Sequence, residues 1–419
     1  MCMVFIRVGT LIQIPFVNAD YMKSLLGDSN MGVLSILTGN ALTQMGIFAL
    51  SISPYISASI IIQLLAIVFH PLEELAKDGK TGQEKYKKII RFTGIGIALV
   101  QATAMAVGFG HNGLIAPYTP LTVCGAVLIW TIGAAILIVI GEFLDLFEIG
   151  SGISMILFIN IISTVPSDVK NIYDMYITNK NIGTACVTAI IVLGVGFVVL
   201  YACNVFTSAE KRITILTSAK MTTGKNSTTM PIPFLTCSVM PVIFTSTVMS
   251  IPLLLARFIP TLQNGVAGEM VNACSQGNWF QIDHPLYSIG VLFYIALNLL
   301  FTCFYLTVQY NPQEIADNLK RSGSMIPGVR PGKETADYLA NITKKVAITG
   351  SMCLVVLILS TTCLMNLCGI SNMALGGTSA IIAVSVINEV RQKISAEIVS
   401  RNVRHKIHAS LFGGRVSNV

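Results

Sequence analysis

The chain has 419 residues, of which 53% are hydrophobic and 11% are charged, and its mean hydropathy is +0.72. Charged residues make up about 25% of a typical soluble domain, so this composition excludes a soluble globular protein and indicates a polytopic membrane protein. The formal net charge is +7, and the distribution of the basic residues indicates how the chain is oriented.

Apolar runs of about 20 residues predict membrane-spanning helices. In chain order, full-length runs lie near residues 52–70, 89–109, 119–141, 183–203, 237–259, 287–309, 344–365 and 373–390, and shorter ones lie near residues 2–16 and 151–166. These runs predict an all-α protein with ten transmembrane helices. Because ten is an even number, we expect both termini on the same side of the membrane.

The segment 36–67 is long enough to cross a membrane, but its two halves differ in hydrophobicity. Its first half, ILTGNALTQMGIFAL, is only weakly apolar, and Pro54 then removes a backbone donor where a continuous helix would run on. Irregular backbone at membrane depth must line a cavity. We therefore interpret the first half as a short re-entrant helix inside a polar vestibule, and the second half as a spanning helix. The polar side chains of the first half are Thr38, Asn40, Thr43 and Gln44.

Basic residues predict the cytoplasmic side, because Lys and Arg resist translocation. Segments 71–91, 204–236, 311–345 and 389–419 hold 22 of the 27 basic residues. We expect these segments, and therefore both termini, to face the cytoplasm. The short loop from Glu142 to Gly150 is an exception, since it is acidic and has no basic residue.

The predicted spans divide into two halves, residues 1–170 and 171–419, with five spans each. Five is odd, so the halves are expected to be inverted relative to each other, which places the working site at their interface near the bilayer midplane. The second half contains two long loops, 204–236 and 311–343, and a basic tail, 391–419. These segments predict a docking surface for a partner.

Several long motifs resemble the SecY family, which forms the central channel of the bacterial Sec protein translocon. They are RVGTLIQIP, GNALTQMGIFALSISPYISASIIIQLL, EELAKDGKTGQEKYKKIIRF, GSGISMILFINII, PVIFTSTVMSIP, YNPQEIADNLKRSGSMIPGVRPGKETADYL and GGTSAIIAVSV. The resemblance implies a channel in the bacterial cell membrane that passes unfolded secretory proteins and releases transmembrane helices through a lateral gate. The partners it implies are SecE, SecG, the SecA motor ATPase, the ribosome with its RNA, signal peptides, nascent chains and membrane lipids.

A channel that passes a peptide but blocks ions requires a narrow apolar collar, because water in a hydrophobic constriction is unfavourable. By motif position, the resemblance implies that the family's pore ring falls on Ile52, Ile56, Ile153, Leu157, Ile243 and Ile382. Pairs four residues apart share one helix face. Taken singly, an Ile or Leu in a membrane helix usually packs against other helices or faces lipid, so only the motif match assigns these six residues to the ring.

The resemblance also implies a plug over residues 32–46, with Val33, Leu34, Leu37, Asn40 and Leu42 packing under the collar or lining the wet funnel. The alternative is an ordinary amphipathic helix at the outer membrane surface.

A lateral gate requires a contact between the second and seventh spans that separates easily, and polar contacts between helices are worth only about 0.6–2 kcal/mol each. Gln63, Gln101, Thr245, Ser246 and Thr247 fit this need. The alternative is static packing, in which Ser and Thr bond carbonyls of their own helix.

Basic side chains in the two long loops predict contact with the phosphates of ribosomal RNA or with an acidic protein surface. Arg330 lies in PGVRPG, where prolines and glycines predict an exposed turn, and it matches the loop arginine that the family uses for ribosome and SecA contact. The tip of the first loop reads MTTGKNSTT, where the family usually has arginines. The predicted docking residues are Lys211, Arg212, Lys220, Lys225, Lys320, Arg321, Arg330 and Lys333.

The main alternative is a secondary transporter for a small solute, which needs ionisable residues inside the bilayer. Glu142, Asp145, Glu148 and Arg257 fall at predicted span ends, and Arg7, inside the first apolar run, is the one questionable case among these residues. An intramembrane protease would need a catalytic Ser with His, an Asp pair or an H-E-x-x-H motif within the spans. No such group lies suitably within the predicted spans, so we expect no enzyme activity and no cofactor. The ten cysteines show no C-x-x-C spacing, so we expect no metal site.

Overall fold

The structure is a computed structural model of the whole chain. It describes residues 2–18, 38–39, 41–77, 79–147, 151–176, 182–217, 227–233, 240–258, 265–279, 285–367 and 377–412. Four predicted plug residues and two predicted docking residues lie outside these ranges, namely Val33, Leu34, Leu37, Asn40, Lys220 and Lys225.

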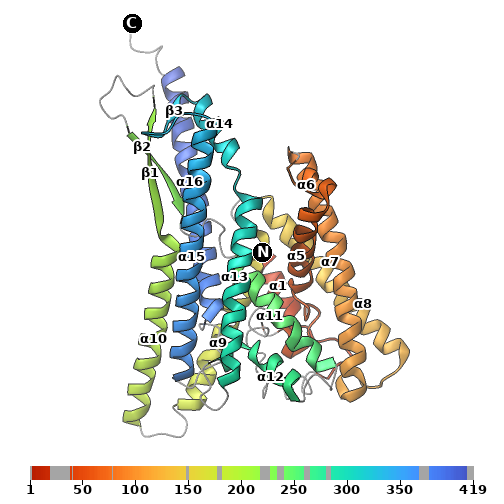
Figure 1. Cartoon of the computed structure of the whole chain (residues 1–419). Coiled ribbons are helices and arrows are strands. Elements are labelled where there is room, and N and C mark those ends of the chain that lie inside the picture. The colour runs from red at the N-terminus through yellow and green to blue at the C-terminus, as the bar shows by residue number, and fades with distance from the viewer. Residues whose placement is uncertain are drawn as a thin grey trace.

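The described chain is mostly helical (Figure 1). The long helices are α1 (Cys2–Leu11), α5 (Ser53–Val68), α7 (Gly79–Phe109), α8 (Pro120–Asp145), α9 (Gly152–Tyr176), α10 (Ile182–Ser208), α11 (Met240–Phe258), α13 (Ile289–Gln309), α15 (Lys333–Leu367) and α16 (Gly377–Phe412). The short helical elements are α4 (Ala41–Gln44), α6 (His70–Lys77), η1 (Gly110–Leu114), α12 (Gly265–Ala273), η4 (Gln276–Asn278), η5 (Pro285–Ser288) and α14 (Pro312–Arg321). The strands are β1 (Glu210–Thr217), β2 (Ser227–Pro233) and β3 (Ser324–Met325).

Several helices are long and apolar enough to cross a membrane, as the composition predicts. Among the described residues, these are the helical stretches Thr81–Phe109, Pro120–Asp145, Gly152–Lys170, Ile289–Arg321 and Lys333–Leu364. Shorter apolar helices cover Ser53–Ala66, Gly194–Ser208 and Met240–Leu253. The total of ten spans stays a prediction.

Several helices are longer than their apolar runs, and three of them show this at the end of the molecule where the long loops lie. α7 starts at Gly79, α15 starts at Lys333, and α16 continues to Phe412. Hydropathy identifies only the part of a helix that lies in lipid, whereas the helix continues wherever its backbone hydrogen bonds and neighbours support it. Here α6 packs on α7, and α14 packs on α15. The loop 311–343 is therefore largely helical.

A small antiparallel sheet joins the two long loops. β1 pairs with β2 from Glu210 opposite Pro233 to Leu216 opposite Ser227, and β3 pairs with the other edge of β1, with Leu216 opposite Met325. One face of the sheet covers a small apolar cluster formed by Ile213, Ile232, Ile326 and Leu339. These strands were not predicted, and the region was interpreted as loops, although Ile213 and Ile215 alternate with exposed residues as a half-buried strand requires.

The long helices form two groups. α5, α7 and α8 pack on one another, while α10, α13, α15 and α16 pack through the pairs α10 with α16, α13 with α15, and α15 with α16. Figure 1 shows the first group in orange and the second in green and blue, with α1, α9 and α11 between them. Across this region α9 contacts α16, and α11 contacts α5 and α7. The largest apolar cluster draws side chains from both groups.

Candidate functional site

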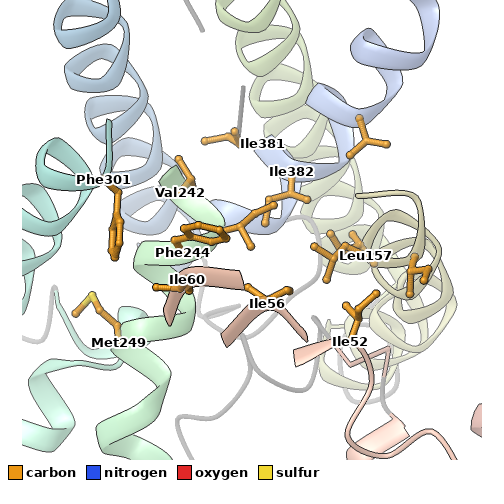
Figure 2. Close-up of a cluster of buried hydrophobic side chains, with 14 of the residues drawn as sticks. Ile52, Ile56, Ile60, Leu157, Val242, Phe244, Met249, Phe301, Ile381 and Ile382 are labelled. Carbon is orange, nitrogen blue, oxygen red and sulfur yellow. The ribbon is translucent and has the colours of Figure 1, made fainter. Parts of the chain in front are cut away.

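The predicted pore-ring residues gather in the largest apolar cluster. Their side chains come from α9, α11, α16 and α5, including the residue just before α5. Five of the six are buried, each at most 4% exposed. The sixth, Ile153, is half-buried and packs against the same cluster. The buried ones are Ile52, Ile56, Leu157, Ile243 and Ile382. Figure 2 shows Ile52 and Leu157 facing the same space, with Ile56 and Ile382 in the same cluster. The structure therefore brings together residues up to 330 positions apart in the chain.

The start of α5 explains how two ring residues reach this space. Ile52 is the N-cap residue of α5, directly before Ser53, and Pro54 lies in the first turn of the helix. The missing backbone donor of proline costs little there, because the first amides of a helix have no partner within it. Ile52, Ile56 and Ile60 are spaced by four and lie on one buried face. The predicted break at Pro54 is confirmed, since the chain before Ser53 forms turns instead of continuing the helix.

Aromatic side chains belong to the same apolar cluster as the predicted ring residues, and the sequence did not predict them. The ring of Phe244 lies 5.9 Å from that of Phe301 and 5.2 Å from that of Tyr305, measured between centroids. Phe301 and Tyr305 are one turn apart on α13, so they share a face. That spacing was the available signal, but the family motifs used to select the ring contained no part of α13.

The described part of the predicted plug, which we call the plug segment, comprises residues 38, 39 and 41–46. It contains only one helical turn, α4, so the re-entrant helix is short here. Leu42 and Met45 are buried in a second apolar cluster with small residues of α7 and α8 and the indole of Trp130. Leu42 thus packs against α7 and α8, in a different cluster from the predicted ring. The small residues are Ala98, Ala102, Ala106, Ala126 and Ala134.

Backbone contacts hold the end of the plug segment. Gly46 forms an antiparallel bridge with Gln13, and the Ile47 amide donates to the Ile12 carbonyl at 3.1 Å. A side chain at Gly46 would collide with the carbonyl oxygen of Thr10. Only glycine permits this close approach, which fixes the end of the plug segment against the chain that follows α1.

α11 contacts α5 and α7, the helices that carry the predicted gate residues, but the hydrogen bonds of Gln63, Thr245 and Thr247 are local. Thr245 donates to the Pro241 carbonyl at 2.8 Å, Thr247 donates to the Ile243 carbonyl at 2.8 Å, and Gln63 donates to Ser59 at 2.9 Å. The two threonines therefore show the alternative of bonding within their own helix. Gln101 is half-buried on α7. Within the part of the chain that the structure describes, no hydrogen bond of these residues crosses from α5 or α7 to α11.

Ser246 points away from the predicted gate. Its hydroxyl accepts a long hydrogen bond from Gln276 at 3.5 Å, and the Gln276 side-chain oxygen accepts from Thr378 of α16 at 3.4 Å. Successive helix residues are rotated by about 100°, so three consecutive residues cannot share one face. Ser246 thus connects α11 to α16 through the side chain of Gln276.

A family model described as SecY matches residues 46–391. The chain belongs to the SecY family. It is 33% identical to the protein translocase subunit SecY of Bacillus subtilis, over 96% of this chain and 93% of the relative. It is 31% identical to that of Staphylococcus carnosus, over 99% of this chain and 94% of the relative.

Solved structures share the fold of this SecY-family protein. A structure titled as that of a protein conducting channel superposes with a TM-score of 0.70 at 19% identity, covering 100% of this chain and 93% of the other. Sec61 from the canine ribosome-channel complex of the endoplasmic reticulum gives a TM-score of 0.67 at 18% identity, with the same coverage. The chain is thus a multi-pass membrane protein with the fold of a protein-conducting channel.

The described residues of this SecY-family protein that are predicted to dock partners lie at one end of the bundle (Figure 1), which we call the basic end. Lys211 and Arg212 are exposed on β1, Lys320 and Arg321 are exposed in the last turn of α14, and Arg330 and Lys333 are exposed before and at the start of α15. The sheet brings these segments to the same end of the bundle (Figure 1). Arg212 pairs with Glu210 at 2.8 Å. The predicted turn around Arg330 is confirmed by the positive φ angles of the glycines at positions 328 and 332.

Ion pairs explain the acidic exception to the charge pattern. Arg91 of α7 forms a bidentate pair with Glu142 at the end of α8, and Lys87 lies 3.2 Å from Asp145. The acidic end of α8 therefore lies against the basic start of α7. Because the two described carboxylates, Glu142 and Asp145, each pair with a cation of α7, the acidic loop is compatible with the predicted cytoplasmic location.

Proposed function

We propose that this SecY-family protein is the central protein-conducting channel of a Sec translocon, which passes unfolded secretory proteins and releases transmembrane helices into lipid. The observation that carries the proposal is the aliphatic cluster at the meeting point of the two helix groups, where α5, α9, α11 and α16 each contribute a predicted ring residue. Membership of the SecY family supports the same role.

The collar acts by excluding water while it is closed. Side chains such as Ile56 and Ile382 fill the constriction with branched aliphatic groups, and a dry constriction blocks ions without any charged gate. The contacts are dispersion contacts and are individually weak, so the side chains can rearrange around a peptide of any sequence. No reacting group takes part in this mechanism.

The plug segment and the gate complete the mechanism. The plug segment, seated against α7 and α8, closes the funnel at rest, and its departure opens a path for the peptide. The lateral exit lies between α11 and the pair α5 and α7. It opens when residues 1–170 and 171–419, as two inverted halves, separate on that side, and the absence of cross-gate hydrogen bonds between described residues supports easy separation.

The basic end receives the partners and faces the bacterial cytoplasm, as do both termini. Six described basic residues of the two loops lie there, which matches the positive-inside pattern. We propose SecA and the ribosome, including its RNA, as the docking partners, and SecE and SecG as the membrane subunits of the bacterial cell-membrane complex. The canine neighbour in the ribosome-channel complex supports ribosome docking.

The test is reconstitution in vesicles with SecE, SecA and ATP, followed by protease protection of a secretory precursor. The channel predicts a protected, full-length precursor that depends on ATP and on the basic end, so that Arg330→Glu abolishes protection while Arg330→Lys retains part of it. A secondary transporter predicts flux of a small solute coupled to an ion gradient, with no protected precursor. That second result would reject the proposed function.

A further inference from the structure

One charged side chain joins α1 to the plug segment. Arg7 lies in the middle of α1 between two exposed apolar residues, Phe5 and Val8. Its Nη1 atom donates to the Gly39 carbonyl oxygen at 2.9 Å and contacts the Thr10 hydroxyl at 3.3 Å. The Thr10 hydroxyl in turn donates to the Arg7 carbonyl at 2.7 Å. The guanidinium is therefore held between its own helix and the plug segment.

A guanidinium within an apolar span is costly and normally has a function. Its five N–H groups need acceptors, and hydrogen bonds from a charged donor are about twice as strong as neutral ones. The Gly39 carbonyl is an acceptor that is present only while the plug segment is seated. Departure of the plug segment would leave that donor without this partner.

The position of the Gly39 carbonyl is fixed by its surroundings. Gly39 has φ +65°, a conformation that favours glycine, and a Cβ atom there would lie 3.0 Å from the Asn160 backbone. Asn160 belongs to α9 and donates to the Ser51 hydroxyl at 2.9 Å. The turn at Gly39 is thus wedged between α1 and α9, with its carbonyl directed at Arg7.

We propose that Arg7 is a positioning residue, a clasp that holds the plug segment in its seat and biases the idle channel towards the closed state. This inference rests on the proposed function and deepens it. Arg7 lies inside the first predicted apolar run and was the one questionable case when the ionisable residues were compared with those of a transporter. The clasp gives that residue a role in a passive channel, where no ion or proton needs to be bound.

The experiment measures resting ion flux through the complex with SecE in vesicles, without SecA or precursor. Arg7→Met removes every donor and keeps the length of the side chain, Arg7→Lys keeps the charge and a donor, and Thr10→Val removes only the contact within α1. We expect about a tenfold rise in flux for Arg7→Met, equivalent to about 1.4 kcal/mol. We expect a smaller rise for Arg7→Lys and none for Thr10→Val.

A second measurement follows the plug segment itself. Thr38 is 3% exposed, so a cysteine introduced there should react slowly with a membrane-impermeant maleimide. Combining Thr38→Cys with Arg7→Met should raise the reaction rate to the same extent as the flux, and the parent without the added cysteine supplies the background from native cysteines. Translocation of a precursor with SecA shows that each variant is folded.

The outcomes distinguish a failure of the Arg7 proposal from a failure of the proposed channel function. If Arg7→Met translocates precursor but neither leaks nor exposes position 38, the clasp is wrong and the channel stands. If Thr10→Val leaks as much as Arg7→Met, the effect comes from α1 and the clasp is likewise wrong. If the unaltered protein translocates no precursor, the proposed function itself fails.

Discussion

The Glu389 carboxylate of α16 accepts a hydrogen bond from the Ser151 amide at the start of α9, at 3.2 Å. The next amide, that of Gly152, donates to Asp145 of α8 at 2.6 Å. Amides at a helix start have no partner within the helix and carry partial positive charge, so carboxylates are favourable there. The start of α9 is thus held by one acid from each helix group.

Glu389→Gln should weaken this link across the two helix groups. The amide oxygen can still accept, but the favourable charge is lost, so we expect a loss of about 0.5–1 kcal/mol in the free energy of unfolding at low salt. The measurement is thermal unfolding in detergent at low and high ionic strength. Lys393→Gln is the control, because it removes only the cation 3.6 Å from Glu389. Equal losses in both variants would show that the ion pair, and not the contact with α9, matters.

Arg91→Gln should destabilise the contact between α7 and α8 more than Lys87→Gln does. Glu142 is 15% exposed and would lose a bidentate partner, whereas Asp145 is 28% exposed and keeps the Gly152 amide. We expect a loss of about 1–3 kcal/mol for Arg91→Gln and at most about 1 kcal/mol for Lys87→Gln. Chemical unfolding in detergent measures both. A reversed order would contradict the assignment.

Gln63→Leu should stabilise the closed gate. The Gln63 side-chain oxygen is buried and has no partner among the described residues, a condition that costs about 1–3 kcal/mol. Removing it should raise the unfolding temperature and reduce translocation of precursors with weakened signal sequences, while normal precursors still pass. Thr103→Val, on the exposed face of α7, is the control and should change neither quantity. Easier passage of weakened signals would reject this role of Gln63.

Ile382→Ser should allow water to enter the proposed collar. A polar side chain at this fully buried position of α16 admits water, so resting ion flux should rise several-fold, and loss of the buried methyl groups costs about 2 kcal/mol or more. Ile387→Ser, on the same helix but 51% exposed, is the matched control for flux. Flux is compared at equal amounts of folded protein in single-channel recordings. Unchanged conductance for Ile382→Ser would remove Ile382 from the proposed ring.

Hydropathy and family motifs predicted much of this fold and site. The apolar runs match the long helices, because burial in lipid demands about 20 apolar residues wherever a helix crosses. Pro54 predicted the start of α5, since it removes a donor that only a first turn can spare. Ile56 and Ile382 were both assigned to the ring from their motif positions, and they lie in one apolar cluster. Residue spacing alone could not have predicted that these two helices meet, because they are far apart in the chain.

Other features depend on tertiary contacts that no local pattern records. The strand β3 has only two residues, and it exists because β1 offers a free edge beside it. The orientation of Ser246 towards Gln276 follows from the rotation of α11, which the motif did not specify. The basic partners of Glu142 and Asp145 lie more than 50 residues away in the chain. The sequence therefore predicted an acidic loop but not the cations that pair with it.

The sheet at the basic end has a mechanical consequence. β1 begins two residues after α10 ends, and β3 lies between α14 and α15. A load that a motor or ribosome applies to either loop therefore spreads through the strand pairing into α10 and α15 together. The second helix group would then rotate as one rigid body relative to α5 and α7, and its helices would not move separately.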